Sequence, residues 1–224
     1  MREIVLDTET TGLDPAAGHR VVELGCVELV NLVPTGRTLH VYFNPEMIMP
    51  TGALDVHGLT DDFLADKPLF AEKAEEMLKF IEDAQLVIHN AAFDMGFLNA
   101  ELARLGRVKL ANSYVDTVTM ARQKFPGQRV SLDALCERFN VDNSSRTKHG
   151  ALLDAELLAE VYLELSGGRQ RDLGLAPEIA ARSTSLSPID APVRPVRPHA
   201  ANPAELAAHT EFMKKLKDPV WLKA

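Results

Sequence analysis

Runs of apolar residues near the start of the chain have the pattern of β-strands. Residues 4–6 are continuously apolar, residues 20–30 are rich in Val and Leu with partial alternation, and residues 38–43 alternate between apolar and polar positions. Each of these patterns is typical of a strand. Since no helical pattern separates the three, we expect them to form an antiparallel meander. Residues 44–60 contain two prolines and two glycines and predict a loop.

The apolar pattern changes to a helical period further along the chain. Pro68 opens a segment in which apolar and small residues recur at helical spacing as far as Ile81. Further strands are predicted at residues 85–89 and 114–117, and further helices at residues 94–105, 132–139 and 150–165. Strands first, followed by alternating helices and strands, predict an α/β domain with a mixed sheet flanked by helices.

The composition changes near the C-terminal end. Six of the 13 prolines fall in residues 176–203, among Ser, Ala and Arg and with few large apolar side chains, which predicts a flexible, extended linker. Residues 202–205 (Asn-Pro-Ala-Glu) are typical of a helix N-terminus, and residues 206–216 predict a short amphipathic helix. The only Trp, Trp221, is expected to anchor an interface with a partner. The alternative is a tail that folds back on its own domain.

Composition and charge limit the kinds of function the chain can have. No run approaches the ~18 apolar residues of a membrane span, and Cys26 and Cys136 both lie in apolar surroundings, so we expect a cytoplasmic protein with core cysteines. The net charge is −8, but residues 169–224 hold nine Lys and Arg against six Asp and Glu. The net charge of residues 1–168 is therefore −11, which excludes nucleic-acid binding through a general basic surface.

Five polar residues are candidates for chemistry. Asp7 and Glu9 are two residues apart at the end of the first strand and share one face. Paired carboxylates repel each other unless a hard cation such as Mg²⁺ or Mn²⁺ binds them. Asp94 follows the strand at residues 85–89, His149 directly precedes the last helix of the domain, and Asp154 lies five residues later. Taken singly, each could be a solvated strand end, a helix cap or a satisfied polar residue.

Together the five residues and their surroundings resemble the DEDDh family of 3′→5′ exonucleases, and within it the proofreading subunits of bacterial replicative DNA polymerases. The resemblance covers residues 3–168 and implies a ribonuclease H-like fold. It rests on Asp-Thr-Glu-Thr-Thr-Gly-Leu (7–13), Val-His-Gly-Leu (56–59), His-Asn-Ala-Ala-Phe-Asp (89–94), Ser-Leu-Asp-Ala-Leu-Cys (131–136) and His-Gly-Ala-Leu-Leu-Asp-Ala (149–155).

The resemblance implies a two-metal mechanism. Two divalent cations, Mg²⁺ or Mn²⁺, about 4 Å apart would clamp the attacking and leaving oxygens of a phosphodiester. Asp7 would bridge the two, Glu9 and Asp154 would help to hold one, and Asp94 would support the other through water. His149 would be the general base that takes a proton from the attacking water. The product would be one nucleoside 5′-monophosphate from the 3′ end.

The resemblance also implies how the substrate is held. Val56 and His57 match the motif that holds the terminal nucleotide, and Phe93 and Leu13 would offer apolar faces to unpaired bases. Many family members have Glu where this chain has Gly52, so we expect no substrate contact there. The expected substrate-binding residues are Asp7, Glu9, Thr10, Leu13, Val56, His57, Phe93, His149 and Asp154.

The C-terminal part implies partners. Gln170, Leu173 and Leu175 are similar to the peptides that dock on bacterial sliding clamps. We therefore expect an exonuclease domain at residues 1–168, a Pro-rich linker with the clamp-binding peptide at 169–201, and an anchor for the polymerase (alpha) subunit at 202–224. A small theta-like subunit is a further expected partner. The alternatives are a free-standing nuclease acting on RNA or on repair intermediates, and an inactive scaffold subunit.

Overall fold

The structure is a computed structural model that describes residues 1–144, 146, 148–168 and 200–216. The chain divides into two units, Met1–Asp172 and Leu173–Ala224, and each is considered by itself. The strands of the first unit are β1 (Arg2–Thr10), β2 (Val21–Val30), β3 (Val33–Tyr42), β4 (Gln85–Ile88) and β5 (Tyr114–Asp116). Its helices are α1 (Thr51–His57), α2 (Asp61–Leu64), α3 (Phe70–Ile81), α4 (Ala91–Arg104), α5 (Thr117–Lys124), α6 (Leu132–Phe139) and α7 (Ala151–Leu165).

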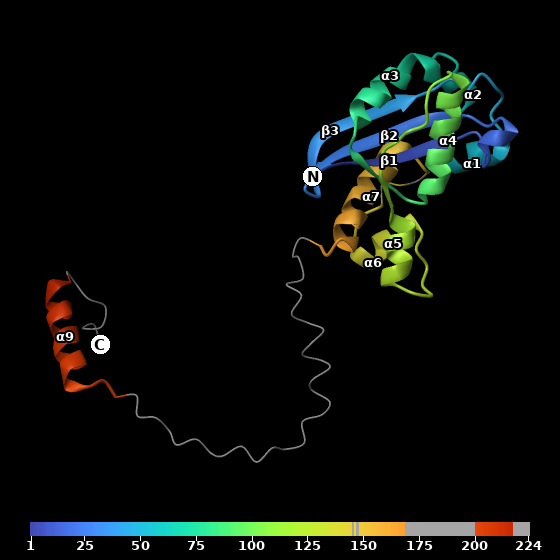
Figure 1. The fold of residues 1–224 in the computed structure, drawn as a ribbon. Coiled ribbons are helices and arrows are strands. Elements are labelled where there is room, and N and C mark those ends of the chain that lie inside the picture. Colours follow the sequence, from blue (N-terminus) through green and yellow to red (C-terminus); the bar gives the residue numbers. More distant parts are fainter. Residues whose placement is uncertain (145, 147, 169–199, 217–224) are drawn as a thin grey trace. The chain divides into compact units, whose positions relative to one another are not determined.

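The five strands form one mixed sheet in the order β3-β2-β1-β4-β5 (Figure 1). The first three strands are antiparallel neighbours, whereas β4 is parallel to β1 and β5 is parallel to β4. This confirms the predicted α/β fold with an antiparallel meander followed by parallel strands. The parallel pairing matters for function, because it brings the carboxyl ends of β1 and β4 to the same edge of the sheet.

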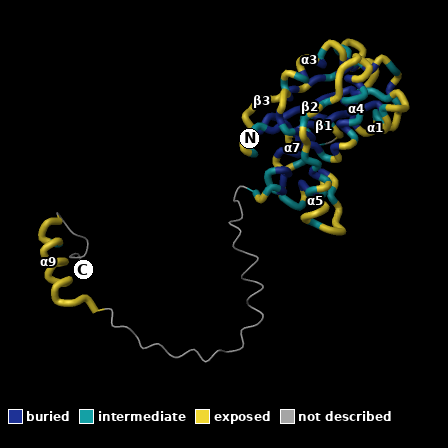
Figure 2. Tube along the Cα trace, viewed as in Figure 1, coloured by how far each residue is buried: buried dark blue, intermediate teal, exposed yellow. Residues whose placement is uncertain are grey.

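Helices cover both faces of the sheet. On one face, Ile4 and Leu6 of β1 pack in a core with α3 and α4, and on the other face Val5 packs with α5, α6 and α7. β1 is therefore apolar on both sides, which explains its unbroken run of Ile, Val and Leu. Figure 2 shows the buried residues concentrated in the central strands and the exposed ones in the outer helices and loops.

The prediction of a loop at residues 44–60 was wrong in part. It contains α1, and α2 follows directly. Pro50, at the N-cap of α1, has the extended backbone of a residue outside the helix, and Gly58 closes α1 with a φ of 75°. Proline before a helix and glycine after it are ordinary helix boundaries. The prolines and glycines that suggested an irregular segment therefore mark, in these two cases, the ends of a short helix.

The third strand is longer than its predicted range of residues 38–43. β3 begins at Val33, which pairs with Val30, so that a two-residue turn joins β2 to β3. Asn31 and Leu32 in this turn have φ values of 53° and 68°, as a tight hairpin turn that matches the strand twist requires. Leucine is uncommon in the left-handed region, and for this reason the sequence did not indicate the turn. Thr10, expected in the first turn, is the last residue of β1.

The described part of the second unit is one helix, α9 (Pro203–Lys215). Asn202 and Glu205 form the predicted capping box, in which each side chain accepts a hydrogen bond from the other's backbone N–H. The helix buries none of its residues. The predicted clamp peptide, most of the linker and Trp221 lie outside the described residues. Among the helices that are described, none is long and apolar enough to cross a membrane.

Candidate active site

The five predicted site residues meet at one edge of the sheet. Asp7 and Glu9 lie near the carboxyl end of β1, and Asp94 lies in the first turn of α4, just after β4. Because β1 and β4 are parallel, these carboxylates reach the same edge. Asp154, in the first turn of α7, and His149, just before that helix, complete the set. All five side chains line one cleft of about 290 Å³.

The approach of α7 to this edge depends on a glycine in the neighbouring strand. Gly25 of β2 is the antiparallel partner of Asp7. A Cβ atom at Gly25 would lie 2.3 Å from backbone atoms of Ala151 and Leu152, at the start of α7. Real Cβ atoms do not approach backbone so closely, so only glycine lets the helix lie directly on the strand. This contact sets how near Asp154 comes to Asp7 and Glu9.

Three ligand-type side chains are close enough to share one cation. Glu9, His149 and Asp154 each offer one donor atom, and these three atoms lie within 4.8 Å of one another. Asp94 is held separately, since its Oδ1 accepts a hydrogen bond of 2.7 Å from the hydroxyl of Thr8. The sequence did not point to Thr8 as a site residue, although it lies between the two carboxylates of β1. Its hydrogen bond fixes Asp94 in position against β1.

Burial raises the pKa values of three of these carboxylates, and for Asp7 and Glu9 the neighbouring carboxylates add to the effect. Burial raises the pKa of Glu9 from its ordinary 4.5 to about 8, and the charge of Asp154 adds to this effect. Burial, followed by the charges of Asp94 and Glu9, also raises the pKa of Asp7 well above its usual range, although Asp7 keeps partial access to the cleft. The pKa of Asp94 is raised as well, again mainly by burial. Without a cation, the site therefore holds protons at neutral pH.

Asp154 differs because it has a cationic partner. Burial pushes its pKa up, but the neighbouring His149 and Arg146 outweigh this and lower it. The guanidinium of Arg146 pairs with both carboxylate oxygens of Asp154, at 2.6 and 2.7 Å. The sequence analysis missed Arg146, because an arginine three residues before a histidine carries no signal of its own. Its position depends on the path of the loop between α6 and α7.

This donor set fits a divalent metal. Four carboxylates and one imidazole converge, three of the carboxylates have pKa values raised by burial, and only Asp154 has a guanidinium partner among the described residues. Oxygen ligands of this kind suit Mg²⁺ or Mn²⁺. A bound cation would remove the repulsion and allow the carboxylates to be charged together.

We predict that the metal-free protein loses stability as pH rises. Glu9, Asp7 and Asp94 have higher pKa values in the folded state than in the unfolded chain, so the folded state binds more protons between about pH 5 and pH 8. The free energy of unfolding should fall by a few kcal/mol, in order of magnitude, across this range. Thermal unfolding in EDTA at pH 5.5 and pH 8 measures the change.

The matched variant for this prediction is Glu9→Gln, whose free energy of unfolding in EDTA should change less between pH 5.5 and pH 8 than that of the wild type. Adding Mn²⁺ at pH 8 should restore the stability lost in EDTA, because ligands that bind only the folded state stabilise it. A metal-free protein that became more stable between pH 5.5 and pH 8 would contradict the assignment of raised pKa values.

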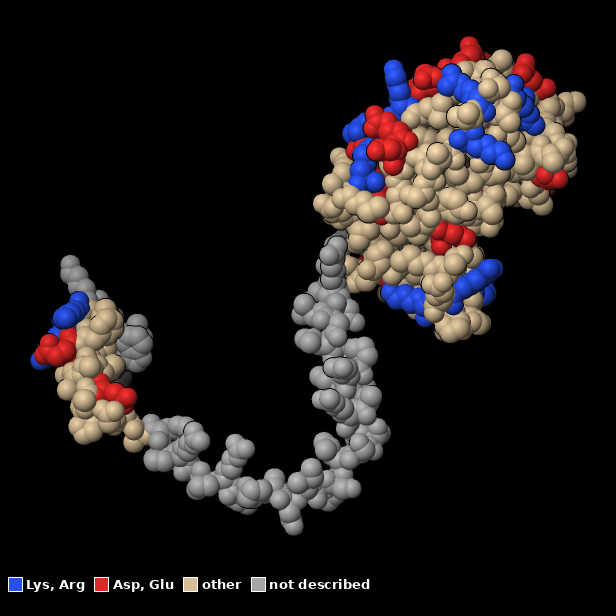
Figure 3. Space-filling model, viewed as in Figure 1, with Lys and Arg blue, Asp and Glu red and all other residues tan. Residues whose placement is uncertain are grey.

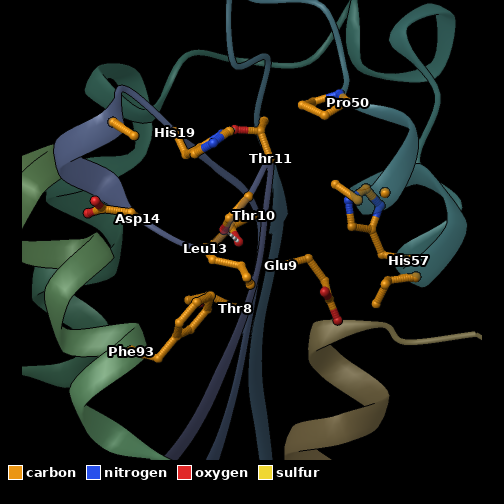
Figure 4. Close-up of a pocket in the computed structure, with 15 residues that line it drawn as sticks. Thr8, Glu9, Thr10, Thr11, Leu13, Asp14, His19, Pro50, His57 and Phe93 are labelled. Carbon is orange, nitrogen blue, oxygen red and sulfur yellow. Dashed lines mark hydrogen bonds between the residues drawn. The ribbon is translucent and has the colours of Figure 1, made fainter.

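A second, larger cavity adjoins the carboxylate cleft. It has a volume of about 650 Å³, and Thr8, Glu9 and Phe93 lie in the walls of both. Figure 4 shows Phe93 and Leu13 on one side of this cavity and His57 and Pro50 on the other, with Glu9 at the side toward α7. Its size suits a nucleotide-sized ligand. The predicted substrate-binding residues Thr10, Leu13, Val56, His57 and Phe93 all line it.

His57 lies in the wall of this cavity, and its Nε2 atom is buried. Its Nδ1 accepts a hydrogen bond of 3.0 Å from the backbone N–H of Leu59, so the proton of the neutral ring is on Nε2. Nε2 is buried and has no hydrogen-bond partner among the described residues. Burial lowers the pKa of His57, and the backbone of Thr10 partly offsets this effect.

Gly52 also lines the cavity, and a Cβ atom there would meet nothing within 4 Å. The cavity is therefore open beside Gly52. The structure thus brings together all the predicted catalytic, metal-binding and substrate-binding residues, in two adjoining hollows. Their roles remain predictions. Gln170, Leu173 and Leu175 lie outside the described residues.

Comparisons with known proteins agree with this geometry. The family model RNase_T, described as an exonuclease, matches residues 4–162. The chain is 58% identical over 174 residues to the DNA polymerase III subunit epsilon of Rickettsia felis, covering 76% of each chain. It is 51% identical over 176 residues to the same subunit of Escherichia coli, covering 75% of this chain and 72% of that one.

Solved structures show the same fold. The nuclease domain of 3′hExo, a DEDDh family member bound to rAMP, matches with a TM-score of 0.65 at 17% identity, covering 73% of this chain and 90% of that one. Exonuclease X in complex with 5′ overhanging duplex DNA matches with a TM-score of 0.58 at 22% identity, covering 74% and 91%. The chain therefore belongs to the exonuclease family of the RNase_T model, together with the epsilon subunits of DNA polymerase III.

Proposed function

We propose that this exonuclease removes mispaired nucleotides from the 3′ end of DNA, as the proofreading subunit of a bacterial DNA polymerase III. The observation that carries the proposal is the junction of the two hollows. A cavity of about 650 Å³ opens onto the four-carboxylate cleft, with Glu9 in the wall of both. One terminal nucleotide fits the cavity, so that its phosphodiester lies at the carboxylates. The names of the most similar relatives support the same function.

The family implies a divalent metal, and we propose two Mg²⁺ or Mn²⁺ ions. Asp7, Glu9, Asp94 and Asp154 would hold them. When bound, they would supply the positive charge that a phosphodiester needs for hydrolysis. The metals would also explain how an acidic domain acts on DNA. The face drawn in Figure 3 carries Lys and Arg interspersed with Asp and Glu, rather than one extended basic surface.

His149 is the proposed general base. Its side chain is 48% exposed and lies at the cleft, where the Nδ1 atom is 3.4 Å from Asp154 Oδ2. The loop that carries it is fixed at its end, since the backbone N–H of His149 donates to the carbonyl of Val56 in α1. The ring can therefore turn toward an attacking water while its backbone stays in place. Taking that proton makes the water nucleophilic enough to attack the phosphorus.

The cavity residues would give the preference for mispaired ends. Phe93 and Leu13 offer apolar surface to an unpaired base, and His57 lies on the opposite side of the cavity (Figure 4). Entry requires the terminal nucleotide to leave the duplex, which costs less free energy when it is mispaired. A mismatch would therefore reach the site more often than a matched pair.

We predict that the protein releases nucleoside 5′-monophosphates from a 3′-mismatched primer-template faster than from a matched one. The release should require Mg²⁺ or Mn²⁺ and stop in EDTA. Mass spectrometry or chromatography of the products measures it. A protein that cleaved short RNA but not DNA would instead be a free-standing RNA nuclease. One that cleaved neither, and that Mn²⁺ did not stabilise against thermal unfolding, would be a scaffold.

We propose that the C-terminal part connects the enzyme to the replication machinery. Residues 1–168 would be the exonuclease domain, residues 169–201 a linker whose segment 170–175 binds the sliding clamp, and residues 202–224 the anchor for the alpha subunit. The exposed, capped helix α9 supports a role outside the nuclease domain. A tether of this kind keeps the exonuclease at high local concentration near the primer end. A theta-like subunit would bind the domain's outer face.

We predict that deleting residues 177–224 leaves hydrolysis of short single strands unchanged but abolishes binding to the polymerase subunit. The described nuclease domain ends before the deletion, and all predicted catalytic, metal-binding and substrate-binding residues lie within residues 7–154. Steady-state hydrolysis and co-migration with purified alpha subunit on gel filtration measure the two outcomes. Polymerase binding that survived the deletion would show that the anchor lies elsewhere.

A further inference from the structure

Arg146 lines the carboxylate cleft. Its side chain is only 8% exposed. The Nε and Nη2 atoms pair with Asp154, at 2.6 and 2.7 Å, and Nη1 pairs with Asp133 Oδ1 at 2.7 Å. A buried guanidinium paired in this way with one of the predicted metal ligands takes the place that a divalent cation would need.

The same guanidinium also engages His149. Nη2 lies 2.8 Å from His149 Nδ1, which is shorter than the 3.4 Å between Nδ1 and Asp154 Oδ2. Because a guanidinium only donates, Nδ1 must accept, and its lone pair is then occupied. In this arrangement Nδ1 cannot take a proton from water. Arg146 thus pairs with a proposed metal ligand, Asp154, and prevents the proposed base, His149, from accepting a proton at Nδ1.

The structure also indicates where Arg146 can go when it leaves Asp154. Asp133 lines both the carboxylate cleft and a polar groove of about 420 Å³, which Arg129 and Asn143 line as well. A guanidinium that kept its contact with Asp133 would remain at the boundary between cleft and groove. Phosphate is the substrate group that a guanidinium binds best.

We propose that Arg146 is a substrate-positioning residue that is stored on Asp154 and His149 in the metal-free protein. It leaves them when the site binds a divalent metal, and then binds the phosphate at the scissile position. The residue that pairs with a proposed metal ligand in the metal-free protein thus later helps to hold the DNA. This inference deepens the proposed function and rests on it for the identity of the substrate.

The first test is Mn²⁺ binding to the full-length chain without nucleic acid. Arg146→Gln should bind Mn²⁺ about tenfold more tightly than the wild type, because no guanidinium has to be displaced from Asp154. Isothermal titration calorimetry or the electron paramagnetic resonance signal of free Mn²⁺ measures the affinity. Unchanged or weaker Mn²⁺ binding would overturn the proposal.

The second test separates phosphate binding from nucleoside binding. At saturating Mn²⁺, Arg146→Gln should bind dTMP about tenfold more weakly than the wild type and bind thymidine equally well. Arg146→Lys, which keeps the charge without the planar fork, should recover part of the dTMP affinity. An equal loss for thymidine and dTMP would mean that Arg146 only supports the shape of the site, and would overturn the phosphate role.

The matched control is Arg107→Gln, which removes an arginine paired with Glu75 on α3. It should change neither Mn²⁺ nor dTMP affinity. In steady-state hydrolysis at saturating Mn²⁺, Arg146→Gln should raise KM about tenfold more than it lowers kcat. The two binding tests need no cleavage, so a failure of the proofreading assignment, seen as no release of nucleotides from DNA, is distinguishable from a failure of this proposal.

Discussion

Asp7→Asn should reduce exonuclease activity by about a thousandfold or more while leaving the domain folded. A metal site contributes several kcal/mol of transition-state stabilisation, and each ~1.4 kcal/mol corresponds to a tenfold change in rate. Asn keeps the shape of Asp7 but cannot supply the negative charge that the proposed metal-binding role needs. Rates of nucleotide release from a labelled single strand in Mg²⁺ measure the loss.

The same substitution should make the metal-free protein more stable at pH 8. The charged form of Asp7 is disfavoured by burial and by Asp94 and Glu9, so removing its charge relieves repulsion that the fold otherwise has to overcome. Opposite effects on activity and stability distinguish a functional carboxylate from a structural one. Glu75→Gln, at an exposed position of α3, is the control and should change neither the exonuclease activity nor the stability of the metal-free protein. An unfolded Asp7→Asn protein, or one with near-normal activity, would count against the site.

His149→Gln should lower kcat by two to four powers of ten with little change in KM. This is the range by which a positioned general base accelerates proton transfer. Glutamine retains hydrogen-bonding capacity but cannot accept a proton at neutral pH. Since the four carboxylates remain, the variant should still bind Mn²⁺. Single-turnover hydrolysis at saturating DNA and Mn²⁺ measures the chemical step directly.

A matched control for His149 is His209→Gln, at an exposed position of α9. It removes an imidazole from the other unit of the chain and should leave kcat unchanged. A His149→Gln protein with kcat within threefold of the wild type would mean that another group takes the proton. The cleft-lining His89 would then be the first to consider, although burial lowers its pKa and its Nδ1 lies 2.9 Å from the hydroxyl of Thr117.

Much of the site could be predicted because its residues occupy the ends of regular elements. Asp7 and Glu9 share a strand face, and Asp94 and Asp154 lie at helix starts, so the local pattern marked them as candidates, and the resemblance to the DEDDh family implied that they act together. Arg146 could not be predicted in this way. It lies in the loop between α6 and α7, and only the path of that loop brings its guanidinium to Asp154 and His149.

The fold was predicted where apolar periodicity is strong and missed where turn chemistry is unusual. The central strands and the helices α3, α4 and α7 follow their apolar patterns closely. The start of β3 was missed because Leu32 adopts a left-handed backbone that glycine or asparagine normally takes. Helix α1 was missed because it has only seven residues between a proline and a glycine. Tertiary contacts, not local pattern, decide such short segments.

Gly25 makes the catalytic geometry depend on a residue that carries no functional group. Because the start of α7 lies directly on its Cα, any side chain there would lift the helix and carry Asp154 away from β1. Protein engineers who kept every metal ligand but redesigned β2 for greater strand propensity would replace this glycine and lose activity. The distance between the proposed metal ligands therefore depends partly on Gly25 having no side chain, although Gly25 is not itself a ligand.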